Sequence, residues 1–336
     1  MLASLFEQVL GQGPLGRHDD FFALGGHSLR AMTLVDRLEH RTGQRIPVAT
    51  MYEAPTVEQL ARHLSGSIRH ARGPHLVPLR VEVDGPPLFC VHNLAGHVWL
   101  YGALAYHLKD RYRVYGLQGE GLDGRPVGFA RVEEMAERYL EEIRPIQPHG
   151  PYHLVGYCLG SRLAFAMAAR LVAQGESVGL LASIDGVGPT LAARILRSGV
   201  VEGHEIDEPD SASAPARRTL HERVGSRLRK LQRHGLARWA CLRAGVGLGV
   251  PGYARNAYLM RVYRRLFLDY RPEPIPVHMM LFRSTPLQRY EKDLGWRPWC
   301  LKGVTTCDIE GPHRLLDDPY AAGLARSIHT SLAAGR

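Results

Sequence analysis

The spacing of apolar residues divides the chain into a helical N-terminal part and a longer part in which strands and helices alternate. In residues 2–11, five apolar side chains recur at the spacing of one helix face: Leu2, Leu5, Phe6, Val9 and Leu10. Residues 27–43 repeat this spacing, and residues 56–64 begin with Thr56, a residue type that starts helices. The pattern predicts a small all-helical domain over residues 1–66.

From residue 76 onward, short runs rich in Val, Leu and aromatic residues alternate with helical stretches such as residues 132–143. These runs are residues 87–93, 152–157 and 178–185. Strands that alternate with helices form βαβ units. We therefore predict an α/β domain with a mostly parallel sheet over residues 76–336.

Two segments interrupt this organisation. Residues 67–75 are mostly polar and contain Gly73-Pro74, which predicts a linker between the two domains. Residues 187–275 lose strand character and become helical and rich in Arg. Because this segment is too long for a simple loop, we interpret it as an insertion into the α/β domain.

The segment Gly156-Tyr157-Cys158-Leu159-Gly160 lies between an apolar run and an Ala-rich helix. This strand–turn–helix context is typical of a nucleophile elbow, with Cys158 in the place of the usual Ser. The flanking glycines permit a strained turn, and the positive end of the following helix favours a thiolate. On this motif alone, a buried structural cysteine between two turn glycines remains the alternative.

Two later residues complete a catalytic pattern. Asp185 ends the next apolar run, and His313 follows a further predicted strand near the C-terminus. The order nucleophile, acid, histidine is that of elbow enzymes, and strand ends of parallel sheets carry their active sites. We expect Cys158 to attack a carbonyl, His313 to take and return the proton, and Asp185 to hold the imidazole tautomer. Taken singly, Asp185 could be a helix-capping or turn residue, and His313 a solvated side chain.

An oxyanion would need two backbone N–H groups in such a site. The residue after the nucleophile, Leu159, is expected to supply one of them. The turn after residues 87–93 is expected to supply the other, from Leu94 or from its neighbour Ala95, with Gly96 allowing close approach of the backbone. We interpret the remaining cysteines as packing residues: Cys90, Cys241, Cys300 and Cys307.

A second candidate site is Ser28, which follows a Gly-Gly turn at a predicted helix start. A serine there is most simply explained as a helix cap. The longer segment HDDFFALGGHSLRAMTLVDRL, however, strongly resembles a peptidyl carrier protein of nonribosomal peptide synthetases, and APTVEQLARHL resembles its closing helix. The resemblance implies a four-helix domain with 4′-phosphopantetheine attached to Ser28.

Residues 76–336 resemble the terminal thioesterase domain of the same assembly lines, an α/β-hydrolase. Four segments carry this resemblance: PLFCVHNLAGHVWLY, GPYHLVGYCLGSRLAFAMA, ASIDG and EGPHRLLDDP. It implies that residues 187–275 form a helical lid over the pocket. It also implies upstream condensation and adenylation modules, a phosphopantetheinyl transferase, and an acyl or peptidyl thioester as substrate. The start of the chain just before the first carrier helix suggests a fragment of a larger synthetase.

The chain departs from this family at three places. Ser161 stands where a second Gly is frequent, and Asn93-Leu94 replaces a common Pro-Ala. Cys158 replaces the customary Ser, so that the covalent intermediate would be a thioester. Transfer from one thioester to another keeps the acyl group activated, which favours release by ring closure to a lactone or lactam over hydrolysis. A Ser-to-Cys change engineered to trap an acyl-enzyme is the alternative explanation.

Composition narrows the remaining classes. With 45% hydrophobic and 22% charged residues the chain is globular, and it has no apolar run of the roughly 20 residues needed to span a membrane and no secretory signal. The five cysteines form no CxxC pair, which argues against a zinc ribbon or a disulfide framework and favours a cytoplasmic location.

The net charge of +9 initially suggests a nucleic-acid partner. The excess lies mainly in residues 211–265, where Glu222 is the only acidic residue, whereas residues 202–210 are acidic. Residues 217–238 contain no Phe, Tyr or Trp, so we expect no nucleic-acid partner. We interpret the charge as a solvated face of the lid; a surface that guides an acidic carrier domain or acyl chain is the alternative. A carrier-linked domain that only docks, with an inactive triad, is the other non-enzymatic alternative.

Overall fold

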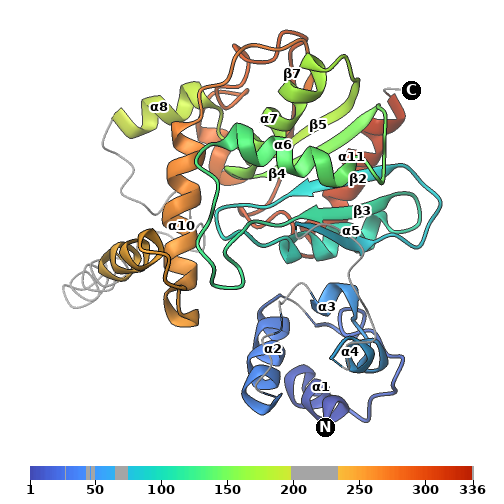
Figure 1. The fold of residues 1–336 in the computed structure, drawn as a ribbon. Helices are drawn as coiled ribbons and strands as arrows, with labels where there is room; N and C mark the ends of the chain where they lie inside the picture. Colours follow the sequence, from blue (N-terminus) through green and yellow to red (C-terminus); the bar gives the residue numbers. More distant parts are fainter. Residues whose placement is uncertain (27, 43–45, 47–49, 65–74, 198–233, 335–336) are drawn as a thin grey trace, which may run out of the picture.

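The computed structural model describes residues 1–26, 28–42, 46, 50–64, 75–197 and 234–334. Its N-terminal lobe is helical and comprises α1 (Leu2–Leu10), α2 (Ser28–Thr42), α3 (Thr50–Glu53) and α4 (Val57–Leu64) (Figure 1). The predicted helix start at Thr56 is a capping box: its hydroxyl accepts from the Gln59 N–H, and the Gln59 side chain accepts from the Thr56 N–H.

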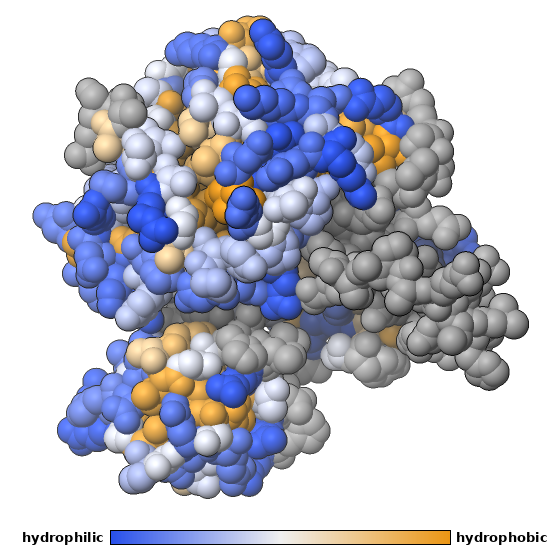
Figure 2. Space-filling model, turned by 180° about the vertical axis from the view of Figure 1, so that it is seen from behind, coloured by the Kyte–Doolittle hydropathy of each residue, from blue (hydrophilic) through white to orange (hydrophobic). Residues whose placement is uncertain are grey.

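The N-terminal lobe has its own small core. Phe6 of α1 and Phe21 of the following loop meet edge to face with ring centres 5.4 Å apart, and both are fully buried. Other apolar side chains around this core are only partly buried, and the view from behind shows apolar surface gathered on this lobe (Figure 2). A lobe of this size leaves much of its apolar surface in contact with solvent.

The second lobe contains a seven-stranded sheet in the order β1-β3-β2-β4-β5-β6-β7. Only the pairing of β1 with β3 is antiparallel; the other five pairings are parallel. The strands are β1 (Leu76–Arg80), β2 (Pro87–Val91), β3 (Arg113–Leu117), β4 (Tyr152–Tyr157), β5 (Val178–Ile184), β6 (Met279–Ser284) and β7 (Val304–Ile309).

Helices cover both faces of this sheet (Figure 1). On one face α6 (Val132–Ile143) packs against α7 (Gly160–Ala173), and on the other α5 (Gly102–Leu108) packs against α11 (Tyr320–Ala334). Every residue of β2 and β4 is buried, as expected for central parallel strands covered on both sides. The predicted mostly parallel α/β architecture is therefore confirmed.

The chain between β5 and β6 is helical where the structure describes it. It contains α8 (Pro189–Arg197), a helix over residues 234–245, and α10 (Gly252–Asp269), which lies along the edge of the second lobe (Figure 1). Residues 198–233, which carry about half of the predicted basic segment, lie outside the described residues. No helix in the described ranges is long and apolar enough to cross a membrane.

The two lobes meet at the edge strand β1. The Arg80 guanidinium lies 3.2 Å from the Asp20 carboxylate, and α3 contacts β1. Phe22 packs against the cores of both lobes. This contact joins the helical lobe to the sheet edge that lies farthest from β7.

Candidate active site

The turn between β4 and α7 holds Cys158 in a strained conformation. Cys158 has φ 54°, in the left-handed region that non-glycine residues rarely adopt. A Cβ at Gly156 would lie 2.5 Å from the Ser161 Cα, and one at Gly160 would overlap the His92 carbonyl oxygen. Only glycine fits at these two positions, so the sequence pattern around Cys158 has the steric cause expected of an elbow.

Three residues far apart in the sequence come together at the carboxyl ends of the strands. The His313 Nδ1 lies 2.8 Å from the Asp185 Oδ2, and the Ser284 N–H donates to the Asp185 Oδ1 at 2.7 Å. The side chains of Cys158, Asp185 and His313 line one pocket, and the three residues are 7%, 2% and 8% exposed. With both carboxylate oxygens engaged, Asp185 is fixed and orients the imidazole through Nδ1.

The surroundings of His313 favour its protonated form. Burial opposes the charge, but hydrogen bonds to Asp185 and Cys158 outweigh it and raise the pKa of His313 to about 10. An imidazolium beside Cys158 stabilises a thiolate, the nucleophilic form of cysteine. His313 is therefore placed to exchange a proton with the Cys158 sulfur.

Tyr157 supports the histidine from a side that the sequence analysis did not identify. Its hydroxyl donates to the His313 backbone carbonyl at 2.9 Å, and the two rings lie 5.0 Å apart. Tyr157 directly precedes Cys158, so the end of β4 positions both Cys158 and, through the Tyr157 hydroxyl, His313. No sequence signal connects positions 157 and 313.

Two backbone N–H groups at the site have no acceptor among the described residues: those of Leu94 and Leu159. The Ala95 N–H is engaged, because it donates to the Asn93 Oδ1 at 3.0 Å. The Gly96 N–H donates to the Asn93 carbonyl at 3.0 Å. Of the two candidate donors, Leu94 and Ala95, Leu94 is the one whose N–H has no acceptor among the described residues.

Ser161, the departure from a more frequent glycine, is incorporated into the site. Its hydroxyl donates to the Gly156 carbonyl and accepts from the Ser183 hydroxyl at 2.9 Å. Both serines are buried, and their hydroxyls leave no room for a Cβ at Gly186. This pair links the elbow to the end of β5, where Asp185 is located.

The pocket beside Cys158 is narrow and mostly apolar. Its cavity volume of about 20 Å³ has room for about one water. Besides the triad and Leu159, it is lined by Val187, Ile195, Leu287 and Tyr290. A larger groove of about 720 Å³ lies at the opposite ends of β5 and β6, away from Cys158.

Ser28 is the first residue of the fifteen-residue helix α2, and its side chain lies outside the described residues. The preceding turn requires glycine: Gly25 has φ 83°, and a Cβ at Gly26 would overlap Phe21. A helix start offers unpaired N–H groups and a positive dipole to a phosphate. The surroundings of Ser28 therefore fit a phosphate-linked group.

The second lobe thus has an α/β-hydrolase fold in which Cys158, Asp185 and His313 lie together at the carboxyl ends of the strands. Residues 86–198 match the family model described as Thioesterase domain, and residues 2–64 match that described as Phosphopantetheine attachment site. The predicted cofactor is confirmed: the N-terminal lobe is a domain to which 4′-phosphopantetheine is attached covalently through a serine. The thioesterase domain makes the chain a hydrolase or acyl-transfer enzyme.

Nearly the whole chain is similar to segments of nonribosomal peptide synthetases. It is 32% identical to malpibaldin synthetase of Mortierella alpina over 98% of this chain and 6% of that protein. It is also 32% identical to the dimodular nonribosomal peptide synthase of Bacillus subtilis (strain 168), over 95% of this chain and 13% of that protein. The chain thus spans a small fraction of the length of these relatives.

Solved structures agree with this similarity. A holo four-domain nonribosomal peptide synthetase bound to AMP and glycine matches 98% of this chain and 25% of its own, with TM-score 0.59 and 26% identity. The NocB thioesterase domain matches 77% of this chain and 99% of its own, with TM-score 0.55 and 22% identity, which supports the fold. Together the findings support a carrier-plus-thioesterase region of a nonribosomal peptide synthetase.

Proposed function

We propose that this chain releases the finished acyl or peptidyl chain of a nonribosomal peptide synthetase through a Cys158-His313-Asp185 triad. We divide it into a carrier domain (1–66), a linker (67–75) and a thioesterase domain (76–336) with a lid (187–275). The observation that carries the proposal is the hydrogen bonding of His313 to both Asp185 and Cys158 above the elbow.

Acylation uses the groups in the order in which they are arranged. Phosphopantetheine, when attached to Ser28, supplies the thiol that presents the acyl chain as a thioester. The Cys158 Sγ attacks the carbonyl carbon, and the oxyanion accepts hydrogen bonds from the Leu94 and Leu159 N–H groups. When the C–S bond to the leaving thiol breaks, His313 donates its proton to that thiol, leaving an acylated Cys158 and a neutral imidazole.

Acylation also prepares the release step. It removes the negative charge of Cys158 that helps to hold the proton on His313, so the imidazole becomes a base. His313 then takes the proton from the attacking group as that group displaces Cys158, which leaves as a thiolate. Because the acyl-Cys158 bond is itself a thioester, enough activation remains for closure of a lactone or lactam. Release as the free acid is the alternative.

The apolar lining beside Cys158 favours an acceptor carried by the substrate itself over water. Apolar walls at Val187, Ile195 and Leu287 offer water few hydrogen-bond partners. We further propose that upstream condensation and adenylation modules supply the acyl chain and that a phosphopantetheinyl transferase modifies Ser28. All five cysteines are free, which is compatible with a cytoplasmic location.

The test is to load the full chain at Ser28 with phosphopantetheine bearing candidate acyl or peptidyl chains, and to identify the products by mass spectrometry. The control is Cys158→Ser, which has the same geometry but forms an oxoester. We expect cyclic product from the native chain and a larger share of free acid from the variant. Free acid alone from both, at similar rates, would rule out the ring-closure proposal while leaving thioesterase activity intact.

A further inference from the structure

Arg162 is an arginine buried inside the protein, two residues into the nucleophile helix α7. It is 1% exposed, and no carboxylate pairs with it among the described residues. Its position in the first turn of α7 is unfavourable for a cation, because the positive end of the helix dipole lies there. The stability of α7 therefore does not explain why this position carries an arginine.

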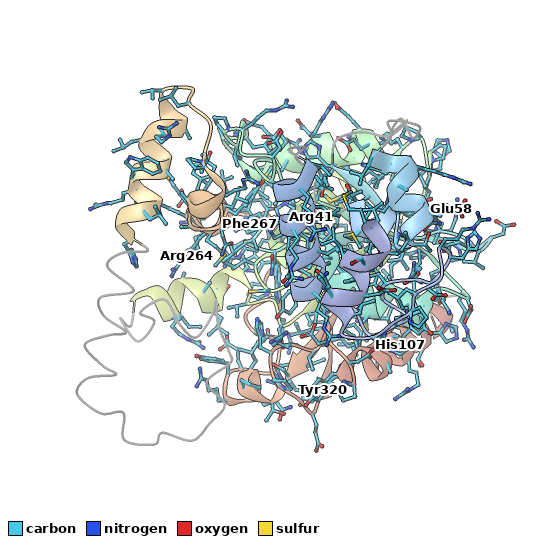
Figure 3. The ribbon with its side chains drawn as sticks, turned by 90° about the horizontal axis from the view of Figure 1, so that it is seen from below. Arg41, Glu58, His107, Arg264, Phe267 and Tyr320 are labelled. Carbon is cyan, nitrogen blue, oxygen red and sulfur yellow. The ribbon has the colours of Figure 1, made fainter. Side chains whose placement is uncertain are left out.

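The guanidinium instead reaches two backbone carbonyls of the insertion. Nη1 donates to the Phe267 carbonyl at 2.7 Å, and Nη2 makes a longer contact of 3.5 Å with the Gly188 carbonyl. Gly188 lies at the start of the insertion and Phe267 near its end. Phe267 is buried in α10 and is labelled, on this helix, in the view from below (Figure 3).

The Phe267 carbonyl is one that a helix cannot satisfy by itself. It lies in the last turn of α10, where carbonyls lack an N–H four residues further on. A cation at this end of a helix is favourable, and here the bond is buried. Burial and the nearby Arg271 lower the pKa of Arg162 to about 10, so it remains charged at neutral pH.

Helix α10 also contacts the strand end that leads to Leu94. The Tyr263 ring lies 4.7 Å from the His92 ring, and its hydroxyl donates to the Glu120 carbonyl at 2.9 Å. Helix α10 therefore contacts two parts of the site: the helix after Cys158, through Arg162, and the segment that leads to Leu94, through His92. The start of the insertion has a second attachment, because the Gly188 N–H donates to the Leu294 carbonyl.

We infer that Arg162 is a positioning residue that holds the end of α10 against α7, the helix that follows Cys158. It holds the start of the insertion there as well, through the longer contact with Gly188. By keeping these segments in place, Arg162 limits the access of water to acylated Cys158. The consequence for water rests on the proposed function. The attachment itself rests only on the geometry.

The experiment compares the full chain with Arg162→Lys and Arg162→Met. Lysine keeps the charge but can reach only one carbonyl well, and methionine can reach neither. Arg113→Lys is the matched control, since Arg113 donates to the Gly85 carbonyl at 2.8 Å, away from the insertion. Hydrogen exchange is followed over residues 259–270, and product partition is measured with the octanoyl thioester of N-acetylcysteamine plus butylamine.

We expect exchange in the last turn of α10 to become about 10-fold faster in Arg162→Lys and faster still in Arg162→Met, with a smaller change near Gly188. The ratio of free acid to amide should rise about 10-fold in both variants and stay unchanged in Arg113→Lys. A variant that only lost stability would speed exchange throughout the domain and leave this ratio unchanged.

Unchanged exchange at α10 in Arg162→Lys, or the same increase in Arg113→Lys, would overturn the attachment. If Arg162→Met fails to fold, Arg162→Lys decides. Faster exchange with an unchanged acid-to-amide ratio would overturn the role in excluding water. If the native chain releases nothing from the probe, the proposed function fails for that acyl group, and the exchange measurement still decides the attachment.

Discussion

Among the described residues, two buried pairs join a histidine to a carboxylate, and one of these pairs lies in the candidate active site. His313 meets Asp185 at 2.8 Å, and His75 meets Glu142 at 2.6 Å. The difference is on the far side of each ring. His313 has Cys158 and a pocket beside it, whereas the His75 Nε2 lies 3.7 Å from a second carboxylate, Glu120.

The two carboxylates also differ in the number of backbone N–H groups that they accept from. Glu142 accepts from the backbone N–H groups of both His75 and Leu76, and so fastens the start of β1 to α6. Asp185 accepts one N–H, from Ser284, and keeps its other oxygen for the histidine. A buried histidine–carboxylate pair therefore anchors the backbone in one place and orients an imidazole toward a thiol in the other.

The largest expected effect comes from removing the two histidines in turn. His313→Ala should lower the rate of chain release by about 10⁴-fold or more, because no group then carries the proton. His75→Ala should leave the rate within about 2-fold, because His75 does not line the pocket that holds Cys158. Single-turnover release from the loaded carrier measures both rates, and equal losses would erase the distinction between the pairs.

Tyr157 sharpens the comparison, because the His313 carbonyl accepts from a side-chain hydroxyl, whereas the His75 carbonyl accepts from the Gln118 backbone N–H at 2.8 Å. Tyr157→Phe keeps the ring and removes the hydrogen bond to the His313 carbonyl. We expect about a 10-fold lower rate of release with little change in stability, as the imidazole is less well oriented. The measurement is the rate against pH together with urea unfolding. A loss of stability without a loss of rate would make Tyr157 a packing residue only.

The pairs should also differ in the pH range over which they stabilise the fold. Burial opposes protonation of His75, but the carboxylates of Glu120 and Glu142 outweigh it and raise the pKa of His75. At Glu142, the His75 ring and the N–H groups of His75 and Leu76 outweigh burial and lower the pKa of the carboxylate. The stability from a raised histidine pKa is full below about 6.5 and is lost as pH rises through the folded pKa; that from a lowered carboxylate pKa is lost as pH falls below about 4.5.

His75→Gln should therefore destabilise most between about pH 4.5 and 6.5, by about 1–3 kcal/mol, and less as the pH rises further. The contribution of protonated His313 persists to higher pH and is lost as pH rises toward about 10. Urea unfolding across this range, with His313→Gln as the counterpart, measures both windows. A difference for His75→Gln that does not vary with pH would contradict the assignment.

The smallest effect is expected at the second carboxylate. Glu120 is partly exposed and lies 3.7 Å from His75, so Glu120→Gln should cost less than about 1 kcal/mol at pH 6. Glu142→Gln, which disturbs two backbone N–H bonds as well, should cost more. Thermal unfolding of the two variants in parallel tests this order, and the reverse order would place the anchor at Glu120.

The sequence was sufficient to predict the parallel sheet, the elbow and the three residues that the structure gathers at the sheet edge. These features follow from short segments of sequence: each of the three residues lies at or just after the end of a predicted strand, in the order typical of elbow enzymes. Contacts between distant residues carry none: nothing links Tyr157 to the His313 carbonyl, or Arg162 to Phe267. The structure favours the Leu94 N–H over the Ala95 N–H as an oxyanion donor because the Asn93 side chain accepts from Ala95. Residue spacing does not predict that contact.

Composition also does not predict which arginines of the insertion make specific contacts. Among its described arginines, Arg255 donates to the Leu122 carbonyl at 2.8 Å and is not a solvated charge. Helix α3 had no apolar period long enough to predict, because it has only four residues. Short elements and buried cations are the features that pattern analysis finds least readily.

The contact between α3 and β1 has a consequence for handling the thioesterase domain alone. β1 is an edge strand with Pro78 and Arg80, two features that discourage pairing with another sheet, and the helical lobe covers it further. A chain beginning at residue 76 loses that cover. We expect such a chain to be less soluble than the two-lobe protein. By covering β1, the carrier domain would then also reduce edge-to-edge aggregation.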